Sequence, residues 1–116
     1  MFEGGALVLI PFPYSDASTL KRRPVLALTK PDQYGDFIGM AVTSRDHHAD
    51  SILVEQSALI VGALPKASWI RIDRVVTLNV SLVTKVFART GIEIHQRAVN
   101  GLCDTLRQSI IPSRKI

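Results

Sequence analysis

Three consecutive cations, Lys21, Arg22 and Arg23, stand directly before Pro24 and an apolar run. A guanidinium makes bidentate hydrogen bonds to phosphate and keeps its charge at any working pH. Arg23, at the junction between the loop and the predicted strand, is therefore a candidate for contacting a phosphate or for stabilising a charged transition state. A solvated basic turn accounts for the same residues, because short runs of charge are common on protein surfaces.

Two hydroxyls and a further cation follow the apolar run that ends at Val42. Thr43 or Ser44 can bond a phosphate oxygen, and Arg45 can add positive charge. The alternative is a strand end at which Ser44 begins a turn. No Ser-His-Asp pattern lies near either hydroxyl, so the segment gives no indication of acyl transfer.

The segment WIRID (69–73) alternates in the manner of a strand. Alternation places Arg71 and Asp73 on one face, where the carboxylate can take a proton and the cation can stabilise charge in general acid–base chemistry on a phosphodiester. A surface salt bridge of small energetic value is the alternative. Trp69 has the same parity and can stack on an unpaired base, although a lone tryptophan is more often a core or interface residue.

The polar segment DHHAD holds Asp46, His47, His48 and Asp50, a composition that resembles a metal cluster. Its spacing differs from the H-E-x-x-H pattern of a helical zinc site, and adjacent histidines on a strand point to opposite faces. We therefore interpret it as a polar hairpin loop and predict no metal site. The single cysteine, Cys103, rules out a disulfide within the chain and a four-cysteine zinc site, and we expect it to be a small core residue.

Short apolar runs separated by turn residues predict the elements that must hold these side chains. Strands are expected over 4–12, 23–29, 37–44, 51–56, 68–78 and 85–90. Pro24 lacks an N–H group and should therefore lie at the start of its strand. The longer segment 57–67, which contains Gly62 and Pro65, is predicted to be a connection.

Apolar residues recur every three or four positions from Ile94 to Ile110, which is the spacing of one helical face. Pro112 should end this helix, and His95 at its start should lie on the surface. Gly101 lowers the helix propensity near the middle by about 1 kcal/mol relative to alanine. Many short strands followed by one helix predict a mainly β fold, a small antiparallel barrel with a C-terminal α-helix.

The length and net charge of the chain limit the class of protein to which it can belong. A chain of 116 residues has room for a single core, so we expect one domain over 1–116. The net charge of +4 favours an acidic partner, such as a nucleic acid or an acidic protein segment. No signal-peptide pattern is visible, and the first apolar run is far shorter than the roughly 20 residues that a membrane span requires. We therefore expect a soluble, cytoplasmic protein.

The segments GALVLIPFPYSD, KRRPVLALT, MAVTSR and GALPKASWIRIDRVVTL, followed by the C-terminal helix, occur in an order that resembles a known family. The sequence is similar to the MazF/PemK-like toxins, or mRNA interferases, of type II toxin–antitoxin systems, from about Gly5 to Ile110. The resemblance implies an SH3-like barrel and sequence-selective cleavage of single-stranded RNA without a metal or other cofactor, often through a 2′,3′-cyclic phosphate. It also implies a homodimer with the RNA groove along its interface, blocked by the flexible acidic tail of an antitoxin.

The same resemblance implies roles for four residues. Arg23 matches the catalytic arginine of the Arg-Pro motif and would stabilise the transition state or protonate the leaving oxygen. Thr43 matches the threonine of the Thr-Ser motif and would position the cleaved phosphate. Arg71 and Asp73 fall where some members use an Arg and an Asp, and Asp73 would be the base that activates the 2′-OH.

The neighbouring residues are predicted to bind RNA, and one catalytic position stays open. The RNA-binding candidates are Lys21, Arg22, Ser44, Arg45 and Trp69. Some family members carry a histidine in the first loop, and residues 13–22 contain none, so the resemblance does not identify a third catalytic group.

The chemistry is also consistent with the residues themselves. Cleavage of RNA by its own 2′-OH needs no nucleophile from the protein; it needs the phosphate held, the hydroxyl deprotonated and the developing charge stabilised. The alternative function is a non-catalytic SH3-like module that binds nucleic acid or an acidic peptide.

Overall fold

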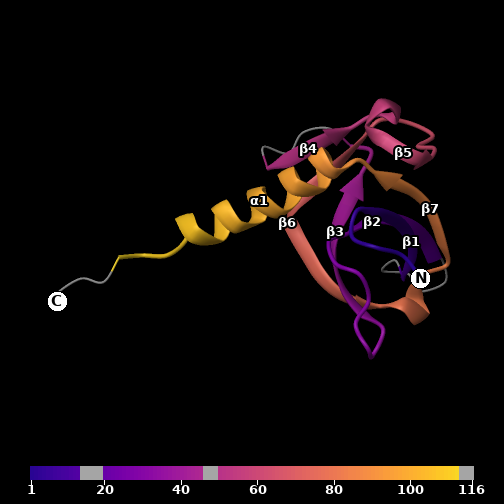
Figure 1. Cartoon of the computed structure of the whole chain (residues 1–116), viewed down its shortest axis with the longest axis horizontal. Coiled ribbons are helices and arrows are strands. Elements are labelled where there is room, and N and C mark those ends of the chain that lie inside the picture. Colours follow the sequence, from indigo (N-terminus) through magenta and orange to yellow (C-terminus); the bar gives the residue numbers. More distant parts are fainter. Residues whose placement is uncertain (14–19, 46–49, 113–116) are drawn as a thin grey trace.

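The computed structural model describes residues 1–13, 20–45 and 50–112. These residues form one antiparallel sheet of seven strands that curves into a half-barrel, with one α-helix following the last strand (Figure 1). The strands are β1 Ala6–Pro13, β2 Leu20–Ala27, β3 Asp36–Thr43, β4 Ser51–Val54, β5 Leu59–Gly62, β6 Ser68–Asn79 and β7 Lys85–Thr90. Their order in the sheet is β4-β6-β3-β2-β1-β7-β5. The prediction of a mainly β, barrel-like fold with a C-terminal helix is confirmed.

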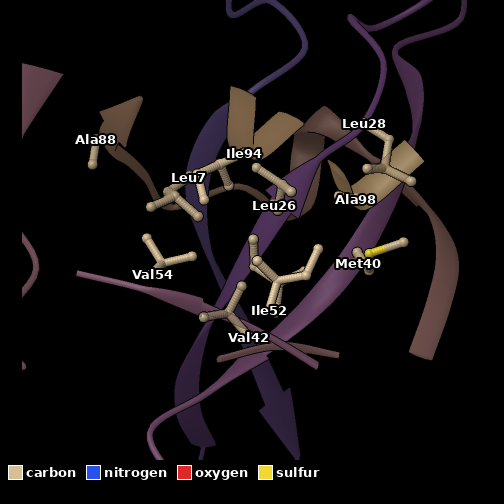
Figure 2. Close-up of a cluster of buried hydrophobic side chains, with 11 residues drawn as sticks. Leu7, Leu26, Leu28, Met40, Val42, Ile52, Val54, Ala88, Ile94 and Ala98 are labelled. Atoms are coloured by element: carbon tan, nitrogen blue, oxygen red, sulfur yellow. The ribbon is translucent and has the colours of Figure 1, made fainter. Parts of the chain in front are cut away.

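The central strands bury both of their faces, which explains their continuous apolar runs. Leu7 and Leu26 point into one core cluster, whereas their neighbours Val8 and Val25 point into a second cluster on the other face of the sheet. Figure 2 shows the first cluster, which includes side chains of the strands and Ile94 of the helix. These strands form a rigid support for the side chains at their ends.

The helix α1, Ile92–Gln108, packs on the sheet through its N-terminal half. Ile94 and Ala98 are its buried residues, and the C-terminal half extends beyond the sheet (Figure 1). Gly101 has a packing reason: a Cβ there would lie 2.7 Å from Cδ1 of Ile72 on β6. Pro112 was predicted to end the helix, but the helix already ends at Gln108. The Ser109 side chain donates a hydrogen bond to Leu106 O at 2.6 Å.

The segment 57–67 was wrongly predicted to be a connection. It contains β5, which pairs with β7 at an edge of the sheet, preceded by a short 3-10 helix, Gln56–Ala58. The Gln56 side chain donates to Gly62 O at 3.0 Å and accepts from the Leu64 N–H at 3.0 Å, so it fixes the end of the strand. Four residues that end in a glycine carry too little periodicity to reveal a strand that depends on a distant partner.

Strand β2 starts earlier than predicted, and Pro24 lies inside it. Pro24 pairs with Leu9 of β1, whereas the pairing of β2 with β3 begins only at Val25. At Pro24 the strand therefore has one neighbour, and a missing N–H on the open side removes no ladder hydrogen bond. Arg23 consequently belongs to the strand itself rather than to a loop–strand junction, opposite Ile10.

Two predictions about the helix were wrong in detail. His95 is half-buried, and its Nε2 lies 2.8 Å from Leu28 O, which ties the helix to the end of β2. Cys103 is half-buried rather than a core residue. None of the helices in the described ranges is long and apolar enough to cross a lipid bilayer.

Candidate functional site

Two adjacent cavities open beside the parts of β2 and β3 that lie beyond their last paired residues, Val25 and Ala41. Four residues, Arg23, Pro24, Val42 and Thr43, line both, so they form the wall between them. The first cavity has a volume of about 760 Å³ and the second about 510 Å³. The predicted arginine of β2 and the predicted threonine of β3 therefore meet at a single wall.

The second cavity brings together all four residues predicted to be catalytic. Its lining contains Arg23, Thr43, Arg71 and Asp73, with Arg74 as a further cation. The cavity therefore combines cations, a hydroxyl and a carboxylate at one place on the sheet.

Arg71 and Asp73 form a bidentate ion pair, which agrees with the prediction that they share a face and also with the alternative of a salt bridge. Arg71 Nη2 lies 2.8 Å from Asp73 Oδ2, and Arg71 Nε lies 3.0 Å from Oδ1. Hydrogen bonding from Arg71 lowers the pKa of Asp73 below its ordinary value, and the charge of Arg71 adds to this against an opposing effect of desolvation. Asp73 is therefore a carboxylate at neutral pH. The Asp73 side chain is 45% exposed, so a substrate can reach it.

An irregularity in β6 places this ion pair beside β3. Ile70 pairs with Val42 and Val75 pairs with Met40, so residues 71–74 of β6 lie against Ala41. Such a bulge bends the strand and redirects its side chains. The bend turns Arg71 and Asp73 toward the wall that carries Arg23 and Thr43.

Thr43 is held in place by a local hydrogen bond. Its Oγ1 accepts the Arg45 N–H at 3.1 Å, so the turn after β3 is closed by Thr43 rather than by Ser44. This bond uses a lone pair of Oγ1 and leaves the hydroxyl hydrogen to donate to a bound anion.

The first cavity is strongly basic. Its described lining contains no carboxylate and six cations, namely Lys21, Arg22, Arg23, Arg45, Lys66 and Lys85. Its remaining lining residues are Leu9, Pro24, Val42, Thr43, Ser44, Ala63, Leu64, Pro65, Ser68 and Phe87. A concave surface with charges of one sign attracts the opposite charge and speeds its encounter.

Four of the five predicted RNA-binding residues lie in this first cavity, and Trp69 does not. Lys21, Arg22, Ser44 and Arg45 line it. Trp69 is half-buried on β6, in register with Thr43 of β3 and Leu53 of β4, and lines neither cavity.

Sequence reasoning missed part of the lining. Lys66, Ser68, Lys85 and Phe87 line the first cavity, and none was a candidate. The two-residue spacing of Lys85 and Phe87 on a predicted strand gave a signal that they share a face. The pairing of β7 with β1, which brings them to the site, joins residues that are far apart in the sequence, from Leu9↔Lys85 to Ala6↔Arg89, and has no local signal.

Most of the DHHAD segment, whose composition resembles a metal cluster, lies outside the described residues. Asp46, His47 and His48 lie outside the described residues, and Asp50 is exposed. Within the described ranges, no group of three or more His, Cys, Asp or Glu side chains is arranged to hold a metal ion.

The family model of the PemK-like, MazF-like toxins of type II toxin–antitoxin systems matches residues 3–110. The chain belongs to this family. The matched range covers nearly the whole sequence and includes every described lining residue of both cavities. The resemblance read from the sequence motifs is confirmed.

Solved structures show the same fold as this family member. An endoribonuclease in complex with its cognate antitoxin, from a mycobacterial species, matches with a TM-score of 0.68 and 13% identity over 97% of this chain and 100% of its own. The Mycobacterium tuberculosis toxin MazF-mt6 matches with a TM-score of 0.61 and 15% identity over 86% of this chain and 96% of its own. No curated protein sequence matches the chain significantly.

Proposed function

We propose that this toxin-family protein is a sequence-selective endoribonuclease that cleaves single-stranded RNA without a metal. The observation that carries the proposal is the second cavity, where Arg23, Thr43, Arg71 and Asp73 line one space. Membership of the toxin family and the fold shared with an endoribonuclease support it.

The proposed reaction uses the RNA's own 2′-OH as nucleophile. Asp73 removes the 2′ proton, the 2′ oxygen attacks the adjacent phosphorus, and the bond from phosphorus to the 5′ oxygen breaks. The departing 5′ oxygen takes up a proton from water. The products are a 2′,3′-cyclic phosphate and a 5′-OH. Arg23 stabilises the charge on the phosphoryl oxygens and Thr43 donates a hydrogen bond that positions them.

Arg71 controls the base strength of Asp73 in this scheme. While Arg71 binds Asp73, the lowered pKa makes the carboxylate a weak base. A phosphate that draws the guanidinium away would let the pKa of Asp73 rise, so the base would strengthen when substrate binds.

The first cavity supplies the binding part of the proposal. Its cations other than Arg23 would hold the phosphates next to the cleaved one, and salt would weaken this binding. We also propose that an acidic antitoxin segment covers this basic surface, that the protein is a cytoplasmic homodimer, and that residues 1–116 act as one domain. One of the structures with this fold is bound to its cognate antitoxin, which supports the antitoxin proposal.

The test is incubation of the purified protein with a long RNA of mixed sequence in excess chelator, followed by mapping of the cut ends. We expect cuts at a few recurring sequences, each with a 2′,3′-cyclic phosphate and a 5′-OH. An Arg23→Ala variant purified in parallel controls for contaminating nucleases. Salt-dependent binding without any cleavage would instead support the non-catalytic module.

A further inference from the structure

The interior of the first cavity is apolar, although its rim is basic. Leu9, Val42, Leu64 and Phe87 are buried or half-buried in the lining, whereas the rim cations Lys21, Arg22, Lys66 and Lys85 are exposed. A volume of about 760 Å³ exceeds what a phosphate group needs and lies in the range of small-molecule sites. This combination fits a nucleotide, with its base inside and its phosphates at the rim.

Phe87 offers a surface on which a base can stack. The pairing of β1 with β7 shifts between Leu7 and Val8, from Ala88 to Val86, so Phe87 has no partner residue on β1. Phe87 packs against the first core cluster and also lines the cavity. Phe87 lines the cavity together with Lys85, and aromatic rings in RNA-binding proteins stack unpaired bases.

Ser68 is the one described lining residue that is both polar and buried, with 4% of its surface exposed. Its hydroxyl donates to Lys66 O at 3.2 Å. While this bond holds, Ser68 Oγ can only accept a further hydrogen bond. A base that offers an acceptor would have to take the hydrogen from Lys66 O, whereas a base that offers an amino group would add a bond at no such loss.

We propose that the first cavity is a subsite for the base next to the cleaved phosphate, and that Ser68 selects a base with an exocyclic amino group. Adenine, cytosine and guanine carry such a group and uracil does not. The position follows from the shared wall: a base in the first cavity belongs to a nucleotide whose phosphate lies at Arg23 and Thr43. The inference rests on the proposed ribonuclease function and adds a specificity-determining residue to it.

The test uses short RNA substrates that contain one mapped cut site and differ by a single amino group. At each nucleotide flanking the cut, adenosine is replaced by purine riboside, guanosine by inosine, or cytidine by pyrimidin-2-one riboside. For the wild-type protein we expect kcat/KM to fall roughly 3- to 10-fold at one of the two flanking positions, the range that one neutral hydrogen bond provides.

The Ser68→Ala variant should cleave both members of each substrate pair at the same rate. Thr90→Val is the matched control, because Thr90 is also buried and its Oγ1 donates to a backbone oxygen, Gly5 O, at 3.0 Å, but it lines neither cavity. It should discriminate as the wild type does.

Two results would overturn the inference and leave the proposed function intact. These are equal wild-type rates for both members of every pair at both flanking positions, and full discrimination by Ser68→Ala. The wild-type comparison needs no variant, so it decides the matter even if Ser68→Ala does not fold. Absence of cleavage of every RNA would overturn the proposed function itself, and the inference with it.

Discussion

The six cations of the first cavity lead to a quantitative prediction about salt. For single-stranded nucleic acid, the logarithm of the association constant falls with the logarithm of the salt concentration, with a slope of about −0.7 for each phosphate neutralised. If all six cations contact phosphates, the slope is about −4, and affinity falls roughly 300-fold between about 50 and 200 mM salt. Lys85→Gln should make the slope shallower by about 0.7.

This prediction can be measured by fluorescence anisotropy with a fully 2′-O-methylated RNA, which has no 2′-OH to attack the phosphate. Lys30→Gln is the matched control, because Lys30 is also exposed but lines neither cavity. It should leave the slope of the wild-type protein unchanged. If Lys85→Gln and Lys30→Gln change the slope equally, or if the wild-type slope is shallower than about −1, the cations of the first cavity do not bind the RNA phosphates.

Three further predictions concern the ion pair, β5 and the helix. Because Arg71 lowers the pKa of Asp73 in the free protein, Arg71→Gln should raise that pKa and move the acid limb of the pH profile of kcat/KM to higher pH. An unmoved limb would remove Asp73 from the chemistry. The small stabilisation from this exposed pair, below about 1 kcal/mol, is present at neutral pH and is lost as the pH falls through the lowered pKa of Asp73. Gly62→Ala should lower the free energy of unfolding, measured from the urea midpoint, by more than about 2 kcal/mol, because φ at Gly62 is +83° and the new Cβ would strike Phe87 O. Gly91→Ala is the control and should cost less than about 1 kcal/mol, because its Cβ would meet nothing closer than 3.7 Å. Similar midpoints for the two variants would contradict this prediction. His95→Ala should cost about 1–2 kcal/mol in the same assay because it removes the hydrogen-bond partner of Leu28 O, and an unchanged midpoint would show that the contact contributes nothing.

Local patterns were enough to predict much of the sheet and one part of the site. The alternation of WIRID placed Arg71 and Asp73 on one face, and the structure shows them as a bidentate pair. The apolar run of β1 predicted a strand, and its continuity is explained by the burial of Leu7 and Val8 in separate clusters. Both features depend on neighbours in the sequence, which is why they could be predicted.

The parts that the sequence did not reveal depend on distant pairing. Strand β5 is defined by β7, and Phe87 reaches the first cavity through the irregular pairing of β7 with β1. Neither partner can be identified from a window of ten residues. His95 has the polarity of a surface residue, and its contact with Leu28 O depends on how the helix docks.

The central claim is that Arg23 carries chemistry while its neighbour Arg22 contributes binding charge. The most direct measurement is the single-turnover rate of RNA cleavage, at saturating protein and low salt, for Arg23→Ala and Arg22→Ala, with circular dichroism to confirm that both are folded. Loss of one group that stabilises charge in a transition state typically costs about 100-fold or more in rate. We predict a loss of that size for Arg23→Ala and a rate near wild type for Arg22→Ala, whose weaker binding is overcome by saturation. Cleavage by folded Arg23→Ala at the wild-type rate would contradict the account.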